Sequence, residues 1–108
     1  MNKDDIRLKI RLSVREIDVI RAIARRLLGD HVCIRIFGSR VQMNEKGGDI
    51  DILLETDRPV PDRVAIACRL TSELQMQLGD QKIDVLIIDS LTPEQPIHKI
   101  ARQTGVLL

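Results

Sequence analysis

Three aspartates stand in segments that otherwise read as buried strands. Asp49 and Asp51 flank one apolar residue in DIDILLE, and Asp84 interrupts the apolar run KIDVLIID. Residues two apart in a strand point to the same face, so Asp49 and Asp51 would lie side by side. Aspartate is depleted in strands, and like charges on one face repel. An exposed edge with a solvated acidic face is one reading, and a carboxylate cluster that binds a divalent cation is the other.

Whether the three aspartates can bind one cation site depends on how the two segments pair. If the strand that carries Asp84 lies beside the strand that carries Asp49 and Asp51, all three carboxylates join one cluster. Mg²⁺ prefers oxygen ligands, and it takes one or two carboxylates from a protein while it keeps waters and substrate phosphates. Three converging carboxylates are typical of a two-metal site. The pattern therefore predicts a site for Mg²⁺ or Mn²⁺ at Asp49, Asp51 and Asp84.

A candidate phosphate site precedes the aspartates. Gly38, Ser39 and Arg40 follow the apolar segment VCIRIF, where a strand would give way to a helical turn with free backbone N–H groups. Gly38 allows close approach, Ser39 adds a hydroxyl donor, and Arg40 adds positive charge. Alone, a Gly-Ser pair after a strand is typical of an ordinary turn. Followed by Asp-Ile-Asp, it predicts a site for a metal-bound triphosphate.

Together these motifs resemble those of the minimal nucleotidyltransferases of the DNA polymerase β superfamily. Their pattern is apolar-Gly-Ser, a spacer, Asp-apolar-Asp-apolar and a later strand aspartate. The resemblance implies that Gly38 and Ser39 hold the triphosphate of ATP or another nucleoside triphosphate. It also implies that Asp49 and Asp51 bind the metal, and that Asp84 helps to deprotonate an acceptor hydroxyl. Many small members have an Arg-Gly pair where Val41 and Gln42 follow Arg40 here, which bears on the subtype.

The resemblance supports two functions of different classes. The first is an enzyme that transfers a nucleoside monophosphate, AMP in the leading case, to a hydroxyl of a protein or a small molecule. The second is a binding module similar to the antitoxins that neutralise HEPN-type helical toxins by contact. Because 108 residues leave no room for an acceptor domain, we expect a helical partner protein or a second copy of the chain to complete the site.

The rest of the chain predicts one α/β (α+β) domain over residues 1–108, with a small mixed sheet and helices packed on it. Ser13 and Glu16 form a capping box for a helix over 14–28 that stops at Gly29. Strands are expected at 6–12, 32–37, 49–55, 82–89 and 106–108. A second helix is expected from the Asp62 cap to about residue 78, with an inward face of Val64, Ala67, Leu70 and Leu74. A last helix is expected after the cap Thr92, with Pro93 in its first turn and Gln95 as the capping-box partner.

Composition excludes several classes of function. A net charge of +1 gives no field that would draw the chain to nucleic acid or to an anionic membrane. Phe37 is the one aromatic residue, so stacking on bases and sequence-specific binding of nucleic acid are not expected. The N-terminus has no apolar stretch, which favours a cytoplasmic protein. Cys33 and Cys68 are expected to be buried reduced thiols, and His31 and His98 to be structural or solvated.

Overall fold

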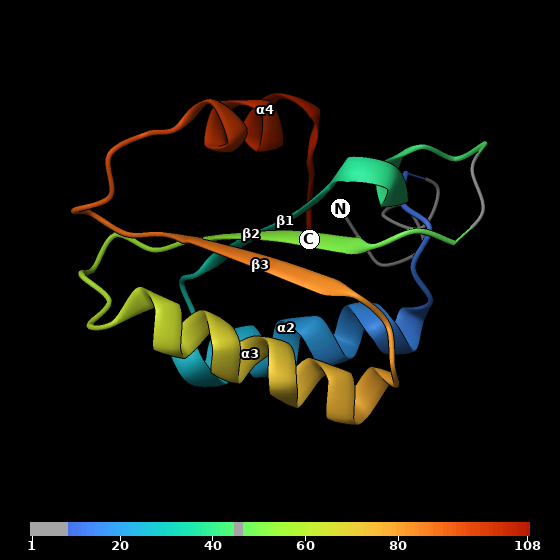
Figure 1. Cartoon of the computed structure of the whole chain (residues 1–108), viewed down its shortest axis with the longest axis horizontal. Coiled ribbons are helices and arrows are strands. Elements are labelled where there is room, and N and C mark those ends of the chain that lie inside the picture. The colour runs from blue at the N-terminus through green and yellow to red at the C-terminus, as the bar shows by residue number, and fades with distance from the viewer. Residues whose placement is uncertain (1–8, 45–46) are drawn as a thin grey trace.

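The structure, a computed structural model, describes residues 9–44 and 47–108. A mixed four-stranded sheet forms the middle layer, with α2 and α3 side by side on one face and α4 on the other (Figure 1). The elements in chain order are α2 (Val14–Leu28), β1 (Cys33–Phe37), the 3-10 turn η1 (Gly38–Val41), β2 (Ile50–Glu55), α3 (Arg63–Leu78), β3 (Ile83–Ile88), α4 (Pro96–Thr104) and β4 (Val106–Leu107).

The sheet has the strand order β3-β2-β1-β4. β1 runs antiparallel to both of its neighbours, whereas β2 and β3 are parallel and in register, with Asp51 opposite Asp84. Successive side chains of each strand point to opposite faces of the sheet. The face under α2 and α3 carries the larger core, including Ile36, Ile52 and Ile83. The mixed sheet with helices confirms the predicted α/β class.

Capping explains where the long helices begin. The Ser13 hydroxyl accepts from the Glu16 backbone N–H, and the Glu16 carboxylate accepts from the Ser13 N–H, so the predicted capping box is confirmed. Asp62 caps α3 by accepting from the Ala65 N–H at 3.1 Å. Both helices end at a glycine with positive φ, Gly29 and Gly79. The apolar sides of α2 and α3 pack on the sheet, and the two helices also pack on each other.

The α3 face differs from the predicted one at Val64. That side chain is 75% exposed, while Leu70 and Leu74 are buried and Ala67 is half-buried. Ile66 packs against the core with them and belongs to the same stripe, at the four-residue spacing of a helix face. Val64 lies two residues before Ile66, about 200° around the helix, and so it points to solvent.

The strand expected at 6–12 is wrong over its described part. Residues 9–12 form a turn and a bend, although Ile10 and Leu12 are buried and Lys9 is exposed as the alternation predicted. The backbone N–H of Arg11 donates to the carbonyl of Arg40 in η1 at 2.8 Å, so this segment is held by a turn and not by a neighbouring strand. Residues 6–8 lie outside the described residues.

The last helix begins later than predicted, at Pro96 instead of after Thr92. Asp89 explains the shift, because its carboxylate holds the loop: Oδ1 accepts from the Thr92 hydroxyl at 2.6 Å and Oδ2 accepts from the Val60 N–H at 2.8 Å. These hydrogen bonds, led by that of Thr92, lower the pKa of Asp89 to about 2. The Thr92 hydroxyl is therefore engaged in the loop, and the Nδ1 atom of buried His98 accepts from the Gln95 N–H at the true helix start.

The cysteines were expected to be buried, and that expectation is wrong. Both thiols are free and exposed. Cys33 begins β1 on the face that carries Arg35, and Cys68 lies on the solvent side of α3, two residues before buried Leu70. Within 9–44 and 47–108 no helix has the length and apolar character that a membrane span requires.

Candidate functional site

The sheet register brings two of the predicted aspartates together. Asp51 lies opposite Asp84 across the parallel pair β2 and β3, and both side chains belong to the face under α4. On its other side, Asp51 lies opposite Phe37 at the end of β1, which is where η1 begins. Asp51 is half-buried and Asp84 is exposed. The Gly-Ser turn and the two carboxylates therefore meet at one end of the sheet, although they are far apart in sequence.

Gly38 lies directly against the Asp51 carboxylate. Its φ is +72°, in the left-handed region that favours glycine. A methyl group at this position would overlap Oδ2 of Asp51 and lie 3.1 Å from its Cγ. The missing side chain therefore leaves the backbone of the turn in contact with the carboxylate, and a small ligand could touch both.

Ser39 is placed next to Asp49 and Gly48. Its hydroxyl donates to the Asp49 carbonyl over a long 3.4 Å, which is a weak hydrogen bond that a better acceptor could replace. Gly48 has a φ of +92°, and a methyl group there would overlap the Ser39 hydroxyl. Two glycines thus clear space around the Asp51 carboxylate and the Ser39 hydroxyl.

The electrostatics single out Asp51. Burial raises the pKa of its carboxyl, the negative charges of Asp84 and Asp49 raise it further, and Lys82 opposes them. The Lys82 ammonium lies 3.5 Å from Oδ2 of Asp49 and is largely exposed. Asp49 itself precedes β2, so its side chain is not fixed by the strand as predicted. Asp51 and Asp84 form a like-charged pair that a cation would stabilise.

Arg40 is engaged elsewhere in the turn. Its guanidinium donates to the carbonyls of Arg11 at 2.7 Å and Gly48 at 3.2 Å, and to the side chain of Gln81 at 3.1 Å. Arginine has five N–H donors in a planar fork, so a guanidinium with these partners braces backbone segments. Its contacts hold Gly48 beside Ser39, and the predicted contact of Arg40 with a phosphate stays a prediction.

Arg11 is a site-supporting residue that sequence reasoning missed. Its guanidinium donates to the carbonyl of Ser39 at 2.7 Å and to that of Gln42 at 2.8 Å. It therefore holds both ends of the Gly38–Val41 turn. The sequence shows Arg11 as a basic residue in a segment of alternating apolar residues. That alternation predicts a strand with an exposed basic face, and it does not predict contacts with the turn.

The donor set fits a metal held by few protein ligands. Within 9–44 and 47–108, no three His, Cys, Asp or Glu side chains are arranged to hold one ion together. Asp51 and Asp84 supply two carboxylates at one register position, which is the number that Mg²⁺ commonly takes from protein when phosphates and waters complete its shell. The register therefore places two of the three predicted metal ligands, Asp51 and Asp84, side by side.

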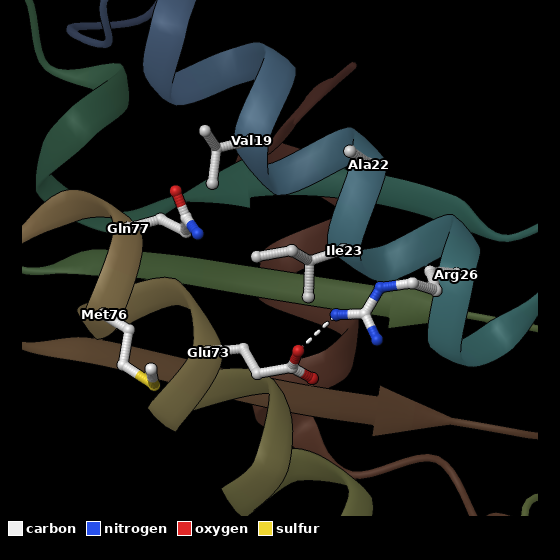
Figure 2. A pocket seen from close by; sticks show the side chains of 7 residues that line it. All are labelled: Val19, Ala22, Ile23, Arg26, Glu73, Met76 and Gln77. Carbon is white, nitrogen blue, oxygen red and sulfur yellow. Dashed lines mark hydrogen bonds and ion pairs between the residues drawn. The ribbon is translucent and has the colours of Figure 1, made fainter.

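Two grooves border the carboxylates. One, of about 460 Å³, lies between α4 and the β1–η1 junction, and its lining includes Gly38 and Asp51. The other, of about 410 Å³, follows β3 beside α3 and includes Asp84. A third groove lies between α2 and α3, where the Arg26–Glu73 ion pair crosses it (Figure 2). Neither Asp51 nor Asp84 lines this third groove.

No protein-family model matches the sequence, and no curated protein matches it.

Proposed function

We propose that the chain is a metal-dependent nucleotidyltransferase of the minimal, polymerase β-like kind. One observation carries the proposal: Gly38, Asp51 and Asp84 meet at one end of the sheet, with the turn backbone against one carboxylate and the second carboxylate beside it. A like-charged pair next to a glycine turn has no evident structural benefit, because opposed carboxylates destabilise a sheet. The substrate is ATP or another nucleoside triphosphate with Mg²⁺ or Mn²⁺.

Each residue of the site has a stated role in this proposal, and Asp84 has two. Ser39 donates its hydroxyl to a phosphate oxygen, and Gly38 lets the phosphates approach the Asp51 carboxylate. Asp51 and Asp84 hold the metal ion, with Asp49 joining when it leaves Lys82. When bound, the metal neutralises the phosphates and stabilises the charge on the leaving pyrophosphate. Arg40 and Arg11 keep the turn in place through the backbone carbonyls they bind.

Asp84 is the base in the proposed reaction. It is exposed on the edge strand β3, which an acceptor can approach from solvent. The acceptor hydroxyl gives its proton to Asp84 as its oxygen forms a bond to the α-phosphorus. The bond from the α-phosphorus to the bridging oxygen breaks, and pyrophosphate leaves with that electron pair. The products are an acceptor that carries a nucleoside monophosphate and pyrophosphate.

The acceptor belongs to a separate molecule in this proposal. The groove along β3 and the open edge of that strand leave Asp84 accessible. A HEPN-type helical toxin is the partner that the motifs favour, and a second copy of the chain is the other. The exposed free thiols of Cys33 and Cys68 are compatible with a reducing cytoplasm, where ATP is abundant.

Nucleotide binding should require the divalent ion. Calorimetry is expected to detect ATP binding in Mg²⁺ or Mn²⁺ and to detect none in excess EDTA, because the triphosphate and the aspartates carry charge of the same sign. Ser39→Ala should weaken binding in Mg²⁺, and Ser90→Ala, at an exposed position beyond β3, is the matched control. Equal affinity with and without EDTA would reject the proposed site.

A further inference from the structure

The groove under α4 touches the proposed site directly. Gly38 and Asp51 are among its lining residues, so a ligand whose phosphates lie at the Gly-Ser turn can extend into the groove. The groove volume of about 460 Å³ is enough for a nucleoside. Its walls are mostly apolar, and they are supplied by Phe37, Val41, Ile97 and Ile100.

The two grooves at the carboxylates differ in chemistry. The one along β3 includes Asp84 and is lined partly by small polar side chains, those of Cys68, Thr71 and Ser72. The one under α4 includes Asp51 and is lined by large apolar side chains. A nucleobase has apolar faces and gains by leaving water for an apolar wall. The acceptor hydroxyl, in contrast, must reach Asp84, the general base of the proposed reaction.

We infer that the groove between α4 and the β1–η1 junction binds the nucleobase and ribose of the substrate. This inference rests on the proposed function, since it concerns the same nucleotide. Ile97 and Ile100 are 43% and 51% exposed, and a base inserted beneath them would cover apolar surface that solvent now reaches. The Thr104 hydroxyl already donates to the Ile100 carbonyl at 2.7 Å, so Gln42 and Asp51 are the polar side chains that a ligand in the groove would meet. The apolar contacts with Phe37, Val41, Ile97 and Ile100 therefore supply most of the affinity for the nucleoside.

The test compares ATP with inorganic tripolyphosphate, which has the phosphates and no nucleoside. Calorimetry in Mg²⁺ should show that wild type binds ATP about tenfold or more tightly than tripolyphosphate, by the burial of apolar area. Ile100→Gln should bring ATP down to the affinity of tripolyphosphate and leave tripolyphosphate binding unchanged. Leu91→Gln, at a side chain 75% exposed outside the groove, is the control and should change neither. If Ile100→Gln unfolds, Ile97→Gln replaces it.

The outcomes separate the two proposals. If wild type binds ATP and tripolyphosphate equally, or if the preference for ATP survives both isoleucine substitutions, the groove does not hold the nucleoside and the proposed function still stands. If the substitutions leave ATP binding intact and raise the KM for an acceptor, the groove holds the acceptor and the inference is overturned. If wild type binds neither compound, the proposed function and this inference are both rejected.

Discussion

Asp51→Asn should reduce nucleotidyl transfer by about 10³-fold or more while the chain becomes more stable. The loss follows because the amide cannot supply the negative charge that holds the cation, and preorganised electrostatic groups contribute about this much to catalysis. The gain follows because Asp51 is a carboxylate that burial and the charges of Asp84 and Asp49 oppose. A rise of a few degrees in Tm at neutral pH is expected, measured by thermal unfolding without metal.

The pH dependence of that gain has a definite sign. The pKa of Asp51 is raised in the folded chain, so this carboxyl binds its proton more tightly when folded. Its contribution to stability is present below the ordinary aspartate pKa and is lost as the pH rises through the raised value. The difference in Tm between Asp51→Asn and wild type should shrink in acid. Asp57→Asn, at an exposed site, is the control; a large fall in Tm for Asp51→Asn would show that this carboxylate is structural.

Gly38→Ala should lower the affinity for ATP and Mg²⁺ and slow nucleotidyl transfer by about 100-fold, because displacing a catalytic group by about 1 Å can cost that much in rate. The added methyl overlaps Oδ2 of Asp51, so the carboxylate or the turn must move. The left-handed φ of +72° adds strain of about 1–2 kcal/mol to the folded chain. Calorimetry gives the affinity and denaturant unfolding gives the stability.

Gly79→Ala separates the two effects. Gly79 has a φ of +88° at the end of α3, and a methyl group there meets no atom within 4 Å. It should show the loss of about 1–2 kcal/mol in stability and no change in ATP affinity. If Gly38→Ala binds ATP as Gly79→Ala does, the contact between the turn and Asp51 has no part in binding.

Local signals predicted much of the fold because they act within a few residues. The Ser13–Glu16 capping box and Gly29 define α2 at both ends, as expected. The pairing of the second and third strands was a conditional expectation, and the structure places Asp51 opposite Asp84 as that expectation required. Apolar residues on both sides of each aspartate explain this success, since a one-residue slip in register would expose buried isoleucines.

Long-range contacts account for what the sequence could not supply. The sequence predicts Arg40 to add positive charge at the phosphate site, but it does not predict the partners Arg11 and Gln81, which lie 29 and 41 residues away. Similarly, the sequence predicts Thr92 as a helix cap, but its hydroxyl donates to Asp89, whose other carboxylate oxygen accepts from the backbone N–H of Val60, 29 residues away. Side-chain hydrogen bonds to distant backbone leave no periodic pattern, so only the fold shows them.

Transfer of label from ATP is the most direct test of the central claim. The purified chain, Mg²⁺ and the proposed helical partner protein would be incubated with ATP labelled either at the α-phosphate or at the γ-phosphate. We predict that the α-label joins the partner, with mass added in units of AMP, that the γ-label does not, and that Asp84→Asn prevents the addition. If the partner stays unlabelled and is neutralised equally by wild type and Asp84→Asn, the chain is not a nucleotidyltransferase and acts by contact.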